Sequence, residues 1–311
     1  MKRKLQIMHD LFEIVQSYEP YTKIAIQENK LSYFDNLKAL CHWHDDIEII
    51  YILKGKMNFY VNGKNILIHE HDGLIINSKQ MHYGYSEQGL DCEFICILIH
   101  PIIFNYNNDF FNHFVKTIIS NNQIEYLYLN NNNLNDHHLL LLFNKLLLLY
   151  KSSISEKEIL YYSIIFKIWH KFYTILKKNF NLSELNSSNI SNDLIIQKNM
   201  TAYIYKNYTQ NISLNDIAES GNICRSKCCK LFKKYLNQTP IDFLNTYRLE
   251  ISKSLLINSN LNITEIALNS GFNHLSYFSK LFYQKYNFTP KEYRKLNKIN
   301  NFNFQNKKTY Y

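Results

Sequence analysis

Four side chains in the N-terminal half of the chain have the chemistry to bind a metal ion or a polar ligand. His42 and His44 are two residues apart, Glu48 follows four residues later, and His82 lies further along the chain. Alternate residues of a β-strand point to the same face, so the two imidazoles of the pair can converge on one site. Imidazole and carboxylate groups are ligands of first-row transition metals. A metal site, a pocket for a polar ligand and a buried histidine cluster are all compatible with this spacing.

A second group of functional residues lies near the C-terminus, where the chain contains the same small unit twice. The first copy runs from Leu214 to Pro240 and the second from Ile263 to Pro290. Each copy predicts a short amphipathic helix, a tight turn and a longer basic helix. This is the plan of a helix-turn-helix, whose second helix enters the major groove of DNA. Two units in one chain predict two adjacent major-groove contacts.

The helix boundaries in this repeat follow from a few residue types. Asn222 and Gly271 stand where the chain must turn, and both residue types tolerate a left-handed backbone. Asn273 is expected to be the N-cap of the second long helix, whereas Cys224 is a poor cap for the first. Thr-Pro pairs then start new helices, and the first of these, from Pro240 to about Ile257, is expected to link the two units.

The segment from Ile263 to Lys295, ITEIALNSGFNHLSYFSKLFYQKYNFTPKEYRK, resembles the C-terminal signature of AraC-type transcription regulators. The preceding segment from Leu214 to Leu256 resembles the first helix-turn-helix and linker helix of that family, although Cys224 replaces a Ser-like cap. The resemblance covers roughly residues 195–296. It implies an all-helical module that binds promoter DNA and usually recruits or positions RNA polymerase.

The outward faces of the two longer helices carry the candidate DNA-contacting side chains, and the resemblance implies that these faces lie over base edges. The candidates for base contacts are Arg225, Ser226, Cys229 and Lys230 on the first helix, and His274, Leu275, Ser276, Ser279 and Lys280 on the second. Contacts to phosphates, which position a protein without reading sequence, are expected from Lys227, Lys233, Lys234, Lys285, Lys291 and Arg294.

The charge distribution also indicates a nucleic-acid partner. The chain has 35 Lys and Arg and 26 Asp and Glu; from Met200 onwards it has 16 basic and 6 acidic residues. The first 199 residues are therefore almost balanced, and the positive charge is concentrated on the repeated units. Such segregation is typical of a surface that neutralises DNA phosphates.

The N-terminal half shows a different pattern, from Glu48 to about Ile99. Short β-rich runs cover residues 48–53, 57–61, 66–68, 74–76 and 94–99. The pair Asn62-Gly63 between two of these runs predicts a type I′ hairpin. Many short strands without intervening helices favour a β-barrel or sandwich. The expected fold class is therefore α+β multidomain, with an N-terminal cupin-like β-barrel, a helical dimerisation segment and a C-terminal all-α double helix-turn-helix module.

The stretch from His42 to Glu48, followed by Gly55, resembles the first cupin motif, and His82 falls where the second motif has a histidine. In cupin enzymes such residues converge inside the barrel on Fe, Mn, Zn or Ni, whereas AraC-type regulators often keep them without a metal. The second motif is also incomplete, because Asn77 stands where proline is typical. We therefore expect no cofactor and an effector-binding pocket that uses His42, His44, Glu48 and His82, with a metal site at the same residues as the alternative.

Two leucine- and aromatic-rich segments, 134–150 and 156–178, are expected to be helices, and charged or polar residues inside both argue against membrane spans. An apolar stripe on the first either forms the dimer contact or covers the barrel: Leu139, Leu142, Phe143, Leu146 and Leu149 or Tyr150. The expected divisions are a sensor domain at 1–115, a helical dimerisation or packing segment at 116–180, a linker at 181–193, a DNA-binding domain at 194–298 and a tail at 299–311.

These features predict a cytoplasmic, dimeric transcription regulator that is not an enzyme. By resemblance, its effector is a sugar or another small polar metabolite. No signal peptide is expected, because the segment from Met1 to Gln16 lacks a continuous apolar core and reads as an amphipathic helix. Two rival hypotheses are a cupin oxygenase or isomerase with a metal at the four residues above, and an architectural DNA-binding protein without a ligand.

Overall fold

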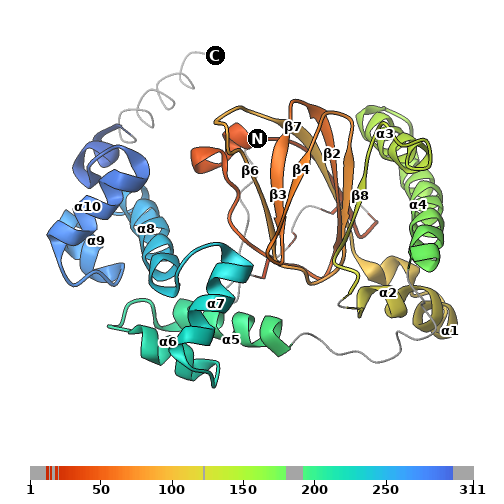
Figure 1. The fold of residues 1–311 in the computed structure, drawn as a ribbon. Helices are drawn as coiled ribbons and strands as arrows, with labels where there is room; N and C mark the ends of the chain where they lie inside the picture. The colour runs from red at the N-terminus through yellow and green to blue at the C-terminus, as the bar shows by residue number, and fades with distance from the viewer. Residues whose placement is uncertain are drawn as a thin grey trace, which may run out of the picture. The chain divides into compact units, whose positions relative to one another are not determined.

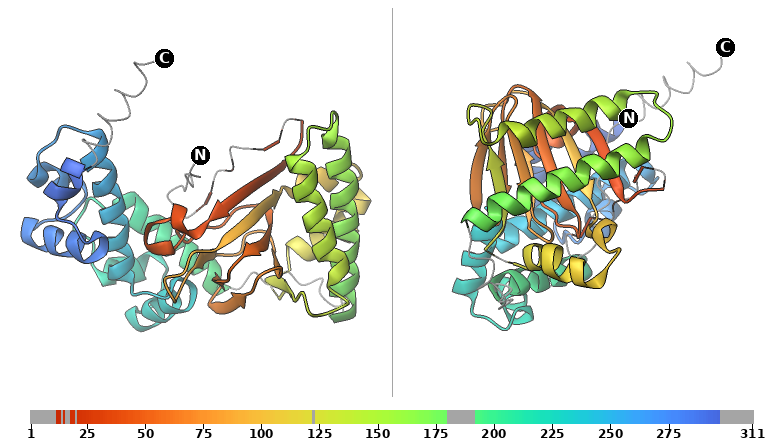
Figure 2. Two further views of the ribbon diagram at one scale, coloured as in Figure 1. Left: turned by 90° about the horizontal axis from the view of Figure 1, so that it is seen from above. Right: turned by 90° about the vertical axis from the view of Figure 1, so that its right-hand side faces the viewer.

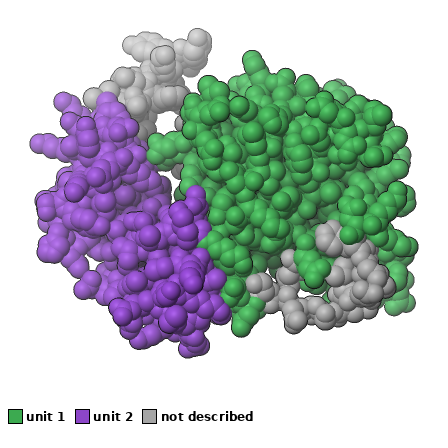
Figure 3. Space-filling model, in the orientation of Figure 1, with its two compact units in different colours: residues 1–195, 234–236 green, residues 196–233, 237–311 purple. Residues whose placement is uncertain are grey.

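The computed structural model describes residues 12–13, 15, 18–19, 21–121, 123–179 and 192–296. The chain divides into two compact units: residues 1–195 with 234–236, and residues 196–233 with 237–311 (Figure 3). The first contains the β-sheets and the second is helical, so the expected α+β fold class is confirmed. The expected tail at 299–311 and most of the expected linker lie outside the described residues, whereas residues 192 and 193 begin a helix.

Unit 1 is built on two antiparallel sheets (Figure 1). The large sheet has the strand order β1-β7-β2-β5-β8, and the small sheet has the order β4-β3-β6. The strands are β1 Ile24–Lys30, β2 Ile47–Lys54, β3 Met57–Val61, β4 Lys64–Ile68, β5 Gly73–Ile76, β6 His82–Tyr85, β7 Glu93–Ile99 and β8 Tyr126–Leu129.

All five runs expected from the sequence are strands, and the hairpin between β3 and β4 has the expected geometry. Val61 pairs with Lys64, and the two residues between them, Asn62 and Gly63, have φ of 45° and 99°, as a type I′ turn requires. Three further strands, β1, β6 and β8, were not expected. β8 comes from the 116–180 segment, for which the sequence predicts helices alone; it is a four-residue strand, too short to show a period.

Strand β2 is buried on both faces, and its alternation divides the interior of unit 1. Ile47, Ile49 and Tyr51 belong to the core shared with the helices, whereas Ile50 and Ile52 belong to the core shared with the small sheet. Figure 2 shows helices α3 His137–Lys151 and α4 Lys157–Asn179 covering one face of the large sheet. The shorter helical elements of unit 1 are η1 Leu31–Tyr33, η2 Asp35–Leu37, η3 Pro101–Phe104, α1 Asn108–Phe110, η4 Phe111–Lys116 and α2 Thr117–Ile119.

The apolar stripe predicted on α3 covers the sheet. Leu139, Phe143, Leu146 and Leu149 are buried in the core between the helices and the large sheet, and Leu142 packs at its margin. Of the two roles that the sequence leaves open for this stripe, packing on the sheet is therefore the one observed. Among the described helices, none is long and apolar enough to cross a membrane.

The amphipathic helix predicted at the N-terminus lies mostly outside the described residues. At residues 12 and 13, which the structure describes, the prediction is wrong. Phe12 forms a parallel bridge with Trp43, and the two rings meet edge-on with centroids 4.8 Å apart. The amide of Glu13 donates to the carbonyl oxygen of Trp43 at 2.8 Å. Backbone pairing with a distant segment therefore replaces the local helical hydrogen bonds here.

The C-terminal part of the chain forms two helix-turn-helix units joined by a long helix (Figure 1). The first unit is α6 with α7, the second is α9 with α10, and α8 connects them. The helices are α5 Asn192–Asn207, α6 Leu214–Ser220, α7 Arg225–Leu236, α8 Pro240–Asn258, α9 Ile263–Asn269 and α10 Leu275–Tyr286, and residues 290–296 are also helical. Both repeated units predicted from the sequence are therefore present.

Each short helix starts with a capping box. Ser213 caps α6 with Asp216 as its partner, and Asn262 caps α9 with its partner three residues on. The signal, a small polar residue three positions before an acidic one, is visible in the sequence. Helices α7 and α10 lack side-chain caps, and Cys224 indeed makes no side-chain cap bond.

The predicted N-cap of α10 is wrong by one residue. His274, not Asn273, occupies the cap position, and its side chain makes no cap hydrogen bond. The start of the linker helix α8 is confirmed: Thr239 accepts a hydrogen bond from the amide of Asp242, and Pro240 follows at the first helical position.

Both turns are left-handed, as expected, with φ of 52° at Asn222 and 84° at Gly271. A Cβ atom at Gly271 would collide with the carbonyl oxygen of Tyr208 and would lie 2.8 Å from Nε of Arg248. That guanidinium is itself fixed, because it donates to the carbonyl oxygens of Tyr208 at 2.8 Å and Gln210 at 2.7 Å. The turn of the second unit therefore closes against the end of α5.

We predict that Gly271→Ala lowers the free energy of unfolding by at least about 3 kcal/mol, because a left-handed backbone and a steric collision act together. Gly89→Ala is the matched control: its φ is 70°, but nothing lies within 4 Å of an added Cβ. That variant is expected to lose only about 1 kcal/mol. Urea denaturation followed by circular dichroism measures both, and equal losses would rule out the collision.

Candidate functional site

His42, His44, Glu48 and His82 form one buried group. One ligand atom from each lies within 4.8 Å of the others, and no residue in the group is more than 5% exposed. Glu48 lies on β2 of the large sheet and His82 on β6 of the small sheet. His42 pairs with His82 through two backbone hydrogen bonds, of 3.1 and 2.9 Å. The group therefore connects the two sheets.

The position of Glu48 follows from the alternation of β2. Its neighbours Ile47 and Ile49 face the helices, so its own side chain points to the opposite side, between the sheets. There the thiol of Cys96, on the adjacent strand β7, donates to Oε1 at 3.0 Å. The other carboxylate oxygen, Oε2, faces the imidazoles, with Nε2 of His82 at 2.6 Å and Nε2 of His44 at 3.2 Å.

The three imidazoles are oriented in the same way. Nδ1 of His42 lies 2.8 Å from the carbonyl oxygen of Leu40, Nδ1 of His44 lies 3.0 Å from that of Asp46, and Nδ1 of His82 lies 2.9 Å from that of Gln80. A carbonyl oxygen only accepts hydrogen bonds, so each Nδ1 carries the proton. Each Nε2 is thereby directed at the centre of the group.

Burial and mutual proximity shift the pKa values of the group. Burial, reinforced by His82, holds the pKa of His42 well below its ordinary value. Burial also acts to raise the pKa of Glu48, but His82 and the hydrogen bonds from His44 and His82 outweigh it, and the pKa is held well below the usual range. For His44, the hydrogen bond and charge of Glu48 outweigh burial, and its pKa is raised. Glu48 is therefore the anionic centre of the group.

The structure brings together all four residues that the sequence singled out, although His42 and His44 do not lie on one continuous strand. It also adds Glu13, which is buried and whose Oε2 lies 3.4 Å from Nε2 of His42. No motif marks Glu13 in the sequence, because only tertiary pairing with Trp43 brings it near the histidines.

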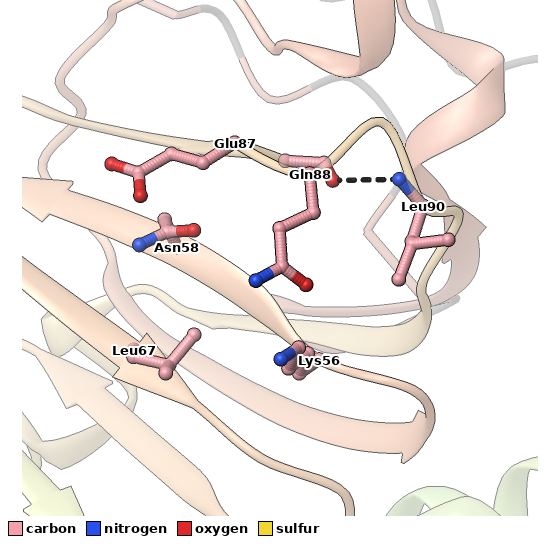
Figure 4. A pocket seen from close by; sticks show the side chains of 7 residues that line it. Lys56, Asn58, Leu67, Glu87, Gln88 and Leu90 are labelled. Atoms are coloured by element: carbon pink, nitrogen blue, oxygen red, sulfur yellow. Dashed lines mark hydrogen bonds between the residues drawn. The ribbon is translucent and has the colours of Figure 1, made fainter.

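A separate pocket lies over strands β3 and β4 and includes none of these residues (Figure 4). It has a volume of about 70 Å³ and is lined by Lys56, Asn58, Leu67, Ser86, Glu87, Gln88 and Leu90. Small-molecule sites usually enclose roughly 300–1,000 Å³. This pocket is therefore too small for a sugar.

The predicted DNA-contacting residues lie on the outward faces of α7 and α10. The exposed residues are Arg225, Ser226, Lys227, Lys230 and Lys233 on the first helix, and His274, Leu275, Ser276 and Lys280 at or near the start of the second. Cys229 and Ser279 occupy matching positions and are half-buried. On the opposite faces, Cys228, Phe232, Phe278 and Phe282 are buried in the cores of the two units.

One of the expected phosphate contacts, Lys285, forms an ion pair within the helical module. Nζ of Lys285 lies 2.6 Å from Oε1 of Glu250 on α8, and the hydroxyl of Tyr286 donates to the same oxygen at 2.9 Å. The charge of Lys285 is therefore used within the module, where it holds α10 against α8. The sequence gives no sign of this pairing, because the two residues are far apart along the chain.

A β-sheet domain with a buried polar group and a helical module with two helix-turn-helix units define a DNA-binding transcription regulator with a ligand-binding domain. The family model described as AraC-like ligand binding domain matches residues 38–163. The model described as Helix-turn-helix domain matches residues 217–296.

The relatives agree with these two matches. The chain is 34% identical over 256 residues to the uncharacterized HTH-type transcriptional regulator YdeC of Bacillus subtilis, covering 82% of this chain and 86% of that protein. It is 32% identical over 126 residues to the Msm operon regulatory protein of Streptococcus mutans, covering 40% and 45%. Among solved structures, fatty-acid-bound ToxT of Vibrio cholerae is 19% identical, with a TM-score of 0.40 and coverage of 89% and 97%.

The chain belongs to the AraC-type transcription regulators. The resemblance predicted from residues 195–296 is thereby confirmed, and so is control through a ligand-binding domain. Members of this family act by binding DNA and not by catalysis, which confirms the prediction that the chain is not an enzyme.

We predict that Lys233→Ala and Lys285→Ala differ in the salt dependence of DNA binding. Loss of one phosphate contact at Lys233 is expected to make the slope of log K against log salt less negative by about 0.9. Lys285→Ala should leave the slope unchanged and instead cost about 1 kcal/mol of stability through the lost ion pair. Binding titrations between about 50 and 200 mM salt measure the slopes. A changed slope for Lys285→Ala would show that this lysine contacts phosphate after all.

Proposed function

We propose that this regulator reads two successive major-groove segments of a promoter with α7 and α10. The observation that carries the proposal is the repetition of one unit, with equivalent exposed polar faces on both reading helices. Helix α8, with 19 residues, is about 28 Å long, which is comparable to the ~34 Å turn of B-DNA that separates two grooves on one side of the duplex.

Base contacts are assigned to the side chains that project from these faces. Arg225, Lys230 and Lys280 have the chemistry to donate to guanine, the commonest specific contact. Leu275 is 42% exposed at the start of α10, and an exposed leucine at this position fits the methyl group of a thymine. Lys227 and Lys233 are assigned to phosphates.

The regulator acts as a homodimer in this proposal, and the contact lies on the outer face of α3. Leu141 and Leu148 are seven residues apart and 62% and 61% exposed, so they form one apolar stripe on the side away from the sheet. Such a stripe suits a second copy of the chain, because a two-fold interface joins identical surfaces. The dimer then binds paired promoter sites with its two DNA-binding modules. This binding takes place in the cytoplasm, where RNA polymerase is the expected partner.

The signal is received at the group of His42, His44, Glu48 and His82. This buried group contains a charged carboxylate and joins the two sheets, so a ligand there would change how the sheets are held. A sugar remains one candidate effector, since the names of two relatives refer to lactose and xylose operons. The chain covers only 47% and 24% of those two proteins.

The test is to mix purified protein with sheared genomic DNA from its source and to sequence the retained fragments. Enrichment of a few promoter-proximal sites with a shared two-part motif supports the proposal, and the spacing of the parts reports the geometry of the two reading helices. Uniform retention of all fragments would show that the chain binds DNA without reading it.

We predict that Lys280→Ala weakens binding to the enriched motif by roughly 1–3 kcal/mol while binding to random DNA falls much less, because a base contact is made only in the specific complex. Lys233→Ala is the control and should weaken both to a similar extent. Fluorescence anisotropy at fixed salt measures all four affinities. If Lys280→Ala lowered the affinity for both DNAs to a similar extent, Lys280 would be reassigned to a phosphate contact.

We predict that the double substitution Leu141→Glu with Leu148→Glu converts the dimer to a monomer, because charges would be buried in the interface. Leu134→Glu is the matched control: Leu134 is 81% exposed but precedes α3. Sedimentation velocity should show a dimer for the wild type and the control. A dimer in the double variant would place the interface elsewhere.

A further inference from the structure

We propose that the hydroxyl of Tyr277, on α10, donates a hydrogen bond to a DNA phosphate, and that Asn245, on α8, holds it in place for this contact. Neither residue is among the DNA-contacting residues expected from the sequence. The inference rests on the proposed function, because it requires α10 to lie in the major groove. It adds a contact with the backbone of the DNA to the base contacts assigned to that helix.

Tyr277 lies at the edge of the outward face of α10. An α-helix advances about 100° per residue, so Tyr277 points about 80° to one side of the mean direction of Ser276 and Lys280. It is 46% exposed, whereas Phe278 and Phe282 are buried on the inward face. A helix is about 10–12 Å wide with its side chains, and the major groove is about 12 Å wide. The centre of such a face therefore points at base edges, and its margins point at the phosphate backbones.

The phenol of Tyr277 has a hydrogen left to donate. The side-chain amide of Asn245, which is only 8% exposed, donates to the phenol oxygen at 3.1 Å. A phenol can accept one hydrogen bond and donate another. Within the part of the chain that the structure describes, the phenol hydrogen has no acceptor. The hydroxyl therefore suits an acceptor supplied by a partner, and a phosphate oxygen accepts hydrogen bonds only.

The ring of Tyr277 is held in place by contacts that begin at α8. Arg248, one turn after Asn245, is fixed by hydrogen bonds to two backbone carbonyl oxygens. Its guanidinium carbon lies 5.8 Å from the centroid of the Phe272 ring. Phe272 in turn meets Tyr277 edge-on, with ring centroids 6.4 Å apart. A side chain that is already ordered loses little conformational entropy when it binds a partner.

The repetition of the helix-turn-helix unit provides an independent argument. Lys227 is the third residue of α7, and Tyr277 is the third residue of α10. Because Lys227 is assigned to a phosphate, the equivalent position of the second unit is expected to face the same kind of group. The first unit would then hold the backbone with a cation and the second with a neutral donor. Only the cation neutralises a phosphate and releases a counterion.

The experiment measures the affinity of the full chain for a short random-sequence duplex and for the enriched motif, by fluorescence anisotropy at several salt concentrations. Tyr277→Phe removes the hydroxyl and keeps the ring. We expect its affinity for both DNAs to fall about tenfold, because a hydrogen bond to a charged group is lost. The slope of log K against log salt should stay unchanged. Lys227→Ala, by contrast, should make that slope less negative by about 0.9.

The matched control is Tyr286→Phe. The hydroxyl of Tyr286 also bonds α8, through Oε1 of Glu250 at 2.9 Å, but it lies at the opposite end of α10. This variant should lower the melting temperature, measured by circular dichroism, and leave the affinity for both DNAs unchanged. The comparison separates the loss of a bond between α8 and α10 from the loss of a DNA contact.

The positioning role of Asn245 is tested with a double-mutant cycle. Asn245→Ala should weaken DNA binding about threefold in the wild type and have no effect when Tyr277→Phe is already present, because it acts only through the hydroxyl. An equal loss in both backgrounds would show that Asn245 affects DNA binding by another route, and its positioning role would be overturned.

Two results overturn the phosphate contact. One is an affinity of Tyr277→Phe that equals the wild-type value on both DNAs. The other is a loss confined to the enriched motif, since a contact made only in the specific complex marks a base.

Lys280→Ala separates this proposal from the proposed function. If Lys280→Ala weakens binding to both DNAs alike while Tyr277→Phe gives the expected loss, the phosphate contact is supported and base reading by Lys280 fails. If Lys280→Ala weakens binding to the motif alone while Tyr277→Phe changes nothing, base reading holds and the phosphate contact is overturned.

Discussion

A carboxylate buried between two β-sheets is the constraint on which unit 1 depends. An unpaired ion at this depth would cost several kcal/mol, so Glu48 requires positive charge or hydrogen-bond donors on every side. The imidazoles of His44 and His82 and the thiol of Cys96 meet that requirement, and they come from three different segments. The same strand presents isoleucines to α3 and α4 on its other face. At Glu48 this strand thus separates the hydrophobic core beneath the helices from a polar centre that lies between the two sheets.

The helical module depends on a different constraint, the need to end a helix, turn sharply and start another within a few residues. Capping boxes at Ser213 and Asn262 start the short helices, and left-handed residues at Asn222 and Gly271 turn the chain. Because these local interactions fix the turns, the fold does not depend on the side chains on the outward faces of α7 and α10. The residues proposed to contact DNA can therefore vary without disturbing the fold, whereas Gly271 cannot.

Local patterns were readable from the sequence, and tertiary pairings were not. The repeated units, the linker helix and the hairpin at Asn62-Gly63 follow from spacing and turn chemistry, and the four residues of the buried group were found from their types. Glu13 and the Lys285–Glu250 ion pair were missed, because residues far apart in sequence meet only in the folded chain. Strand β6 was missed for a related reason: His-Tyr-Gly-Tyr shows no apolar alternation and is fixed by its neighbours.

Helix α8 fixes the orientation of α10 relative to α7. Its first turn is fixed by Thr239 and Pro240, and Arg248 at its middle is clamped to the end of α5. An α-helix advances about 100° and 1.5 Å per residue, so inserting a single residue in α8 would rotate α10 by about 100° relative to α7. The spacing of the two proposed DNA contacts is thereby set by α8, whereas their chemistry is set by the exposed side chains of α7 and α10.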